Sequence, residues 1–110
     1  GKHMGEQFEN KNEKQIQSSS LRALSVSRSE FHQYFLDFEN KFGEMACPLC
    51  KKTLWGVPPR EDSQDHPALI TYPLPNSAGR GIWAFPVICM ECGYIATFAA
   101  NHVSGKIKGG

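Results

Sequence analysis

The chain has 110 residues, with 12 basic and 11 acidic side chains and a net charge of +1. This length suits one domain, and the balanced charge excludes a function based on a general attraction to polyanions. No apolar run approaches the roughly 20 residues of a membrane-spanning helix, and no apolar signal-peptide core follows the N-terminus. We therefore expect a cytoplasmic protein without a membrane partner.

The first 20 residues are expected to be disordered. The opening GKHM is typical of a cloning remnant, and the stretch up to residue 20 is polar, with few apolar side chains to bury. Residues 21–26, LRALSV, fit either a short strand or a segment that docks on the domain. We expect one folded domain over residues 21–103.

Residues 27–43 carry the clearest helical pattern. Ser27 and Glu30 have the spacing of a capping box, in which each side chain satisfies the backbone N–H of the other residue. Aromatic side chains then recur at the spacing of one helix face: Phe31, Tyr34, Phe35, Phe38 and Phe42. Gly43 suits the end of the helix. The sequence predicts a helix over about residues 28–42.

This aromatic stripe admits two interpretations. It packs against the cysteine-containing part of the domain, or it forms a face for a partner protein or for a helix-mediated dimer. Five aromatic side chains on one face exceed what a very small module usually buries, so both interpretations stay open.

After the helix, the sequence has short runs typical of β-strands, separated by Gly and Pro. Strands are predicted over 53–57, 82–89 and 94–100. Residues 68–75 are extended, and two prolines place them at the edge of a sheet. Other segments are predicted to lack regular structure: a polar loop over 58–67, a turn over 76–81 and a flexible tail over 104–110.

Four cysteines form two C-x2-C pairs separated by 38 residues: Cys47 and Cys50, then Cys89 and Cys92. A C-x2-C turn directs two thiolates to one side, and two facing turns complete a tetrahedral Zn²⁺ site. Pro48 stiffens the first turn, and Gly93 follows the second, where the chain must fold back. A reducing compartment favours metal binding over disulfides.

The two pairs, CPLCKK and CMECGY, resemble the zinc knuckles of the zinc-ribbon fold group. The resemblance covers residues 46–100 and implies two β-hairpins that hold one structural zinc ion through the four cysteines. Lys51 stands where this group usually has glycine, and the stretch between the pairs is longer than in a minimal ribbon. The expected fold is therefore α+β: an amphipathic helix packed on a small zinc ribbon over about residues 45–100.

The two cysteine pairs also admit other uses. A rubredoxin-like iron site has the same ligands, so an iron electron carrier stays open. A thioredoxin-like pair fits poorly, because a strand-like segment follows the first pair. Catalytic zinc keeps an open coordination position, which four cysteines would close, and no hydrolase or deaminase motif accompanies them. We do not expect an enzyme.

The sequence thus predicts a non-catalytic zinc domain that serves as an interaction module, with a protein partner as the first hypothesis. Direct nucleic-acid binding by the ribbon is the alternative. Its candidate contacts are basic and aromatic: Lys51, Lys52, Trp55, Arg80 and Trp83. The aromatic members of this set fit better as core residues of a small domain, which has few other large side chains to bury.

Overall fold

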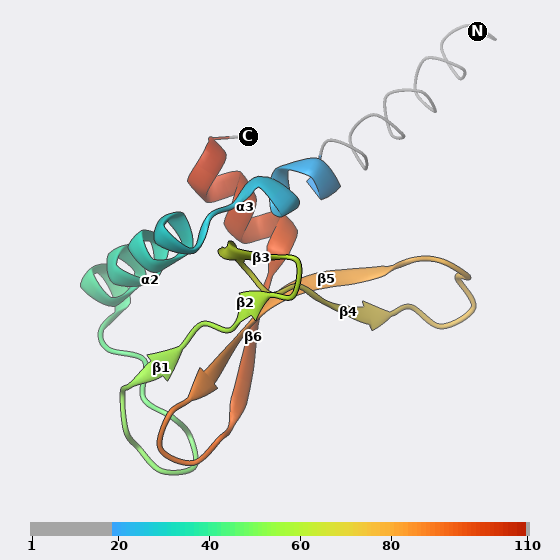
Figure 1. Cartoon of the computed structure of the whole chain (residues 1–110). Helices are drawn as coiled ribbons and strands as arrows, with labels where there is room; N and C mark the ends of the chain where they lie inside the picture. The colour runs from blue at the N-terminus through green and yellow to red at the C-terminus, as the bar shows by residue number, and fades with distance from the viewer. Residues whose placement is uncertain (1–18, 110) are drawn as a thin grey trace, which may run out of the picture.

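The computed structural model describes residues 19–109, which form an α+β domain with its helices gathered on one side of an antiparallel sheet (Figure 1). Most of the segment predicted to be disordered, residues 1–18, lies outside the described residues. Residues 19–25 are helical. Ala23 and Val26 are buried in the core, so the segment over residues 21–26 docks on the domain and is not a strand.

Helix α2 (Arg28–Phe42) begins and ends where the sequence predicts. The Ser27 hydroxyl accepts a hydrogen bond from the backbone N–H of Glu30, and the Glu30 carboxylate accepts one from the N–H of Ser27. These two bonds form the predicted capping box. At the other end, Gly43 has a positive φ of 97°, and its N–H donates to the carbonyl of Glu39.

The main sheet is organised around strand β5 (Gly81–Cys89). Strand β6 (Ile95–Ala99) pairs with β5, as do β4 (Ile70–Pro73) and β1 (Trp55–Gly56), all antiparallel. Ala84 pairs with residues of both β4 and β6, and Ile88 with residues of both β1 and β6. Because a strand has only two edges, β1 and β4 share one edge of β5, and β6 occupies the other.

The predicted polar loop over residues 58–67 is wrong. Strands β2 (Pro59–Arg60) and β3 (Ser63–Pro67) pair there as a small second sheet. Long-range contacts hold this hairpin: Arg60 donates to the carbonyl of Leu24 at 3.0 Å, and Arg28 donates to the carbonyls of Val57 and Gln64. Its polar sequence lacks the apolar alternation by which a strand is recognised.

The flexible tail predicted over residues 104–110 is also wrong. Helix α3 (Ala100–Lys108) occupies this part of the chain, and Val103 and Ser104 are buried. Arg22 Nε donates to the Ser104 hydroxyl at 3.1 Å. The helix contains a glycine and has no side-chain N-cap, so tertiary packing rather than local propensity stabilises it.

The core lies between the helices and one face of the main sheet. The fully buried rings of Phe31 and Phe85 pack with centroids 5.1 Å apart. Phe98 of β6 receives edge-on contacts from three rings of α2, those of Phe31, Phe35 and Phe38. Most of the aromatic stripe therefore packs inward, as the first interpretation predicts.

Candidate metal centre

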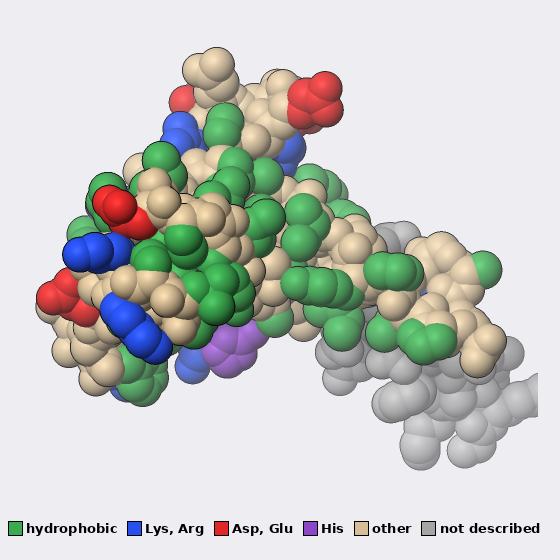
Figure 2. Space-filling model, turned by 90° about the horizontal axis from the view of Figure 1, so that it is seen from below, with side chains coloured by type: hydrophobic (Ala, Val, Ile, Leu, Met, Phe, Trp, Pro, Cys, Tyr) green, Lys and Arg blue, Asp and Glu red, His purple; other side chains and the backbone are tan. Residues whose placement is uncertain are grey.

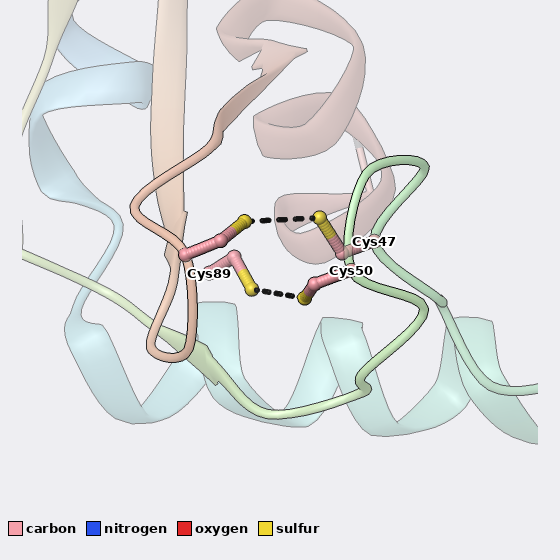
Figure 3. A group of neighbouring side chains, drawn as sticks. Cys47, Cys50 and Cys89 are labelled. Atoms are coloured by element: carbon pink, nitrogen blue, oxygen red, sulfur yellow. Dashed lines mark hydrogen bonds between the residues drawn. The ribbon is translucent and has the colours of Figure 1, made fainter.

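The four cysteines come from two connecting segments at one end of the main sheet. Cys47 and Cys50 lie between α2 and β1, whereas Cys89 ends β5 and Cys92 lies in the turn before β6. Pairing of β1 with β5 sets Trp55 opposite Cys89. The sheet register thus brings together two cysteine pairs that are far apart in the sequence (Figure 3).

The four sulfur atoms form a compact cluster in which all lie within 4.8 Å of one another. The Sγ atoms of Cys47 and Cys92 are 3.5 Å apart, and those of Cys50 and Cys89 are 3.4 Å apart, so the short distances cross between the two turns (Figure 3). Both greatly exceed the ~2.05 Å of a disulfide bond. They lie near the ~3.8 Å edge of a tetrahedron with metal–sulfur distances of about 2.3 Å. The donor set therefore fits a tetrahedral metal ion.

The two cysteine turns share one backbone conformation. The N–H of Lys51 donates to the carbonyl of Cys47 at 2.9 Å, and the N–H of Gly93 donates to that of Cys89 at 2.9 Å. In each turn the first cysteine also donates its N–H to the carbonyl five residues on, at 2.8 Å in both. Lys51 and Gly93 both have positive φ values, 68° and 85°. Lys51 therefore adopts a left-handed backbone conformation that favours glycine.

Backbone N–H groups point at the sulfurs of both turns. Burial raises the pKa of Cys47, but the N–H groups of Cys50 and Leu49 and the neighbouring thiol of Cys92 outweigh burial and lower this pKa to about 6. The Leu49 N–H lies 3.4 Å from the Cys47 sulfur. A turn that donates N–H bonds in this way stabilises thiolate, the form that binds metals.

Two other cysteines, Cys92 and Cys50, favour the protonated thiol. At Cys92 the Tyr94 N–H lowers the pKa, but desolvation and the proximity of the other sulfurs raise it to about 12. The pKa of Cys50 is raised, although the Lys52 N–H lowers it, because desolvation and Cys89 favour the thiol. A bound cation would replace these protons and neutralise part of the negative charge.

Burial differs between the four cysteines. Cys47 and Cys89 are buried, Cys50 is half-buried and Cys92 is exposed. The cluster therefore lies at the surface, with two cysteines anchored in the domain and two in the outer part of the turns.

The structure does not bring the predicted nucleic-acid contacts together. Lys51 and Lys52 are exposed beside the metal-ligand cluster, whereas Arg80 and Trp83 lie near the start of β5, at the opposite end of that strand. Trp55 is half-buried, and its indole N–H donates to the carbonyl of Met45 at 2.7 Å. Trp55 and Trp83 both pack against the core.

The predicted helix face divides along its length. Phe31 is buried; Tyr34, Phe35 and Phe38 are partly buried, and Phe42 is 68% exposed. Only the C-terminal end of the stripe therefore lies open, and Lys41 places its ammonium 5.3 Å from the Phe42 ring centroid. The sequence pattern identifies the face but not the point at which the sheet stops covering it.

Comparison of the chain with protein-family models, curated proteins and solved structures finds no match. Within residues 19–109, none of the helices has the length and apolar character needed to cross a membrane. Fold and site together define a small α+β domain with a four-cysteine cluster suited to a metal ion.

Proposed function

We propose that this chain is a non-catalytic zinc domain whose role is to bind another protein molecule. The observation that carries the metal assignment is the four-sulfur cluster, in which all sulfur atoms lie within 4.8 Å of one another. Four thiolates with backbone N–H donors suit Zn²⁺. Rubredoxin-like iron is the alternative for the same ligands, and metal analysis separates the two.

The proposed ion would hold the two cysteine turns together. One turn follows α2, and the other joins β5 to β6, so the metal would cross-link the helical side of the domain to the end of the main sheet. Structural zinc contributes on the order of 10–16 kcal/mol in small modules, comparable with the whole stability of a domain. The chemistry supplied by the metal is thus structural, because a four-sulfur shell leaves no open position for substrate.

A protein partner is favoured over nucleic acid by the distribution of charge. Nucleic-acid binding needs several basic groups along one path, but the candidates Lys51 and Lys52 lie at one end of β5 and Arg80 at the other. The outer surface of β4 includes exposed Ile70 and Tyr72. Apolar exposure of this kind is typical of protein contacts.

Metal analysis tests the first half of the proposal. Purified protein is expected to be colourless and to hold one equivalent of zinc, and a chelator or the Cys89→Ser substitution should abolish its cooperative unfolding. Met90→Ser, in the same turn but not a ligand, is the matched control and should keep the metal. Visible absorption from iron, or an unchanged NMR spectrum after demetallation, would contradict the assignment.

Oligonucleotide titration tests the second half. We expect no binding to labelled single- or double-stranded oligonucleotides at physiological salt. Binding that falls steeply as salt rises, and that is lost in Lys51→Glu and Lys52→Glu, would instead establish the nucleic-acid alternative.

A further inference from the structure

The four cysteines of the chain differ in their access to solvent. Cys47 and Cys89 are buried, Cys50 is half-buried, and Cys92 is the exposed member of the cluster. The two cysteine turns form the lowest part of the domain in Figure 1, so Figure 2 views the molecule from their end, where hydrophobic, basic and acidic side chains all reach the surface. A small molecule in solution therefore meets the cluster first at Cys92.

Each accessible sulfur lies beside a buried sulfur of the opposite turn. The Sγ atom of Cys92 is 3.5 Å from that of Cys47, which is completely buried. Cys50 and Cys89 make the equivalent contact at 3.4 Å (Figure 3). A sulfur that is oxidised at either accessible position thus has a second sulfur within reach, and that second sulfur is itself shielded from the oxidant.

The reactivity of the four sulfurs toward a peroxide depends on thiolate character and on exposure. A metal ion binds cysteines as thiolates, so an occupied site would supply thiolate at all four positions. Exposure then selects Cys92 as the first sulfur to react. The oxidised Cys92 sulfur would no longer bind the metal as a thiolate, and the Cys47 sulfur is its neighbour across the turns.

We propose that Cys92 is a peroxide-sensitive site whose oxidation exchanges the metal for two disulfide bonds between the turns, Cys47–Cys92 and Cys50–Cys89. The Cys92 thiolate attacks the O–O bond of hydrogen peroxide, which gives a sulfenic acid and hydroxide. The Cys47 thiolate then attacks the Cys92 sulfur, forms the S–S bond and releases a second hydroxide. A second peroxide oxidises Cys50 and Cys89 in the same way. Two peroxides thus accept the four electrons that the two S–S bonds release, and Zn²⁺ leaves the site.

These disulfides would hold together the same parts of the fold as the metal. Each joins the turn after α2 to the turn between β5 and β6, across 45 residues in one case and 39 in the other. A bond that closes a long loop stabilises the folded state by restricting the unfolded chain, whereas disulfides within the C-x2-C pairs would leave the two turns unconnected. The oxidised domain is therefore expected to stay folded without metal. This inference rests on the proposed zinc site and names its regulation.

Peroxide treatment of the metal-loaded full chain tests this inference. We expect hydrogen peroxide to release one equivalent of zinc, detected with a chromogenic chelator, and to leave a chain lighter by four hydrogen atoms than the reduced chain. Peptide mapping with cleavage inside each turn should find the Cys47–Cys92 and Cys50–Cys89 bonds. The oxidised, metal-free protein should keep a cooperative thermal transition that the reduced, chelated protein lacks. Dithiothreitol with added zinc should restore the starting state.

Histidine substitutions separate the exposed cysteine from the others. Cys92→His keeps a zinc ligand, because three cysteines and one histidine also form structural zinc sites. It removes the exposed thiolate, so peroxide should release zinc several-fold more slowly. Cys50→His is the matched control: it makes the same exchange in the other turn, keeps the Cys47–Cys92 pair and should release zinc at nearly the wild-type rate. Each variant is first shown to bind one equivalent of zinc.

Four results would overturn the inference alone and leave the zinc assignment standing. They are zinc that stays bound in excess peroxide, cysteines converted to sulfinic acids without disulfides, disulfides within the C-x2-C pairs, and equal rates of release from Cys92→His and Cys50→His. Loss of the cooperative transition in the oxidised protein would overturn the expected exchange of one cross-link for another. A chain purified without zinc would contradict the proposed function and this inference together, so the two failures are distinguishable.

Discussion

Lys51 and Gly93 occupy equivalent positions in the two cysteine turns, and both have positive φ values, 68° and 85°. Each N–H closes its turn on the carbonyl of the first cysteine at 2.9 Å. Glycine adopts this conformation without strain, whereas a residue with a Cβ does so at a cost of about 1–2 kcal/mol. The first turn is therefore strained, and the second is relaxed.

Replacing the strained residue should stabilise the domain. We expect Lys51→Gly to raise the free energy of unfolding of the metal-loaded protein by about 1 kcal/mol, because relief of the backbone strain outweighs the added freedom of the unfolded chain. Gly93→Ala should lower the free energy of unfolding by about the same amount. A Cβ at this position meets no heavy atom within 4 Å, so the whole cost comes from the positive-φ backbone conformation. Urea unfolding measures both. Lys52→Gly is the control, and an equal loss of stability in Lys51→Gly and Lys52→Gly would contradict the prediction.

The aromatic side chains of α2 should contribute less to the free energy of unfolding toward the C-terminal end of the helix. Phe31 is completely buried against Phe85, whereas Phe42 is 68% exposed. Phe31→Leu should lower the free energy of unfolding by about 1.5 kcal/mol, since a leucine fills the site incompletely. Phe42→Leu should change it by less than about 0.5 kcal/mol. Similar losses at both positions, measured by denaturant unfolding, would show that the sheet covers the whole stripe.

Glu30 links the start of α2 to the end of α3 and makes stability depend on pH. The backbone N–H of Ser27, and then Lys108 at 2.9 Å, lower the pKa of Glu30 below its usual 4.5. A carboxyl with a lowered folded-state pKa stabilises the protein above its unfolded-state pKa and loses that contribution as pH falls through the folded-state value. Its contribution is therefore present at neutral pH and lost below about pH 4.5.

Glu30→Gln should consequently lower the free energy of unfolding by about 0.5–1 kcal/mol at pH 7, a modest figure because the ion pair is partly exposed. The difference from wild type should narrow when thermal unfolding is repeated below pH 4.5. Glu44→Gln, at an exposed position after the helix, should show no such trend. A Glu30→Gln difference that is constant with pH would refute the assigned contacts.

Helix α3 should be part of the stable folded domain and not a flexible tail. Val103 is 1% exposed, so Val103→Ala should lower the free energy of unfolding by about 1–2 kcal/mol. Lys106→Ala, on the exposed side, should be neutral. Backbone amides of α3 should also resist hydrogen exchange. If Val103→Ala were neutral and these amides exchanged freely, the flexible tail predicted from the sequence would be the correct description.

Local signals in the sequence were sufficient to predict α2 and the four cysteines that cluster. The capping box, the helical spacing of the aromatic residues and Gly43 act within a few residues of one another, so the predicted and observed helix bounds agree. The two C-x2-C turns are equally local. The strands predicted over 82–89 and 94–100 match most of β5 and all of β6 for the same reason, since both are dense in β-branched and aromatic residues.

The other elements could be found only in the tertiary structure, because the contacts that stabilise them join residues far apart in the sequence. The β2–β3 hairpin depends on Arg28 and Arg60, which bond to distant carbonyl groups, and α3 depends on the contact between Arg22 and Ser104. The sequence by itself determined which sulfurs meet and where the first long helix lies; the fold determined how much of that helix the sheet covers.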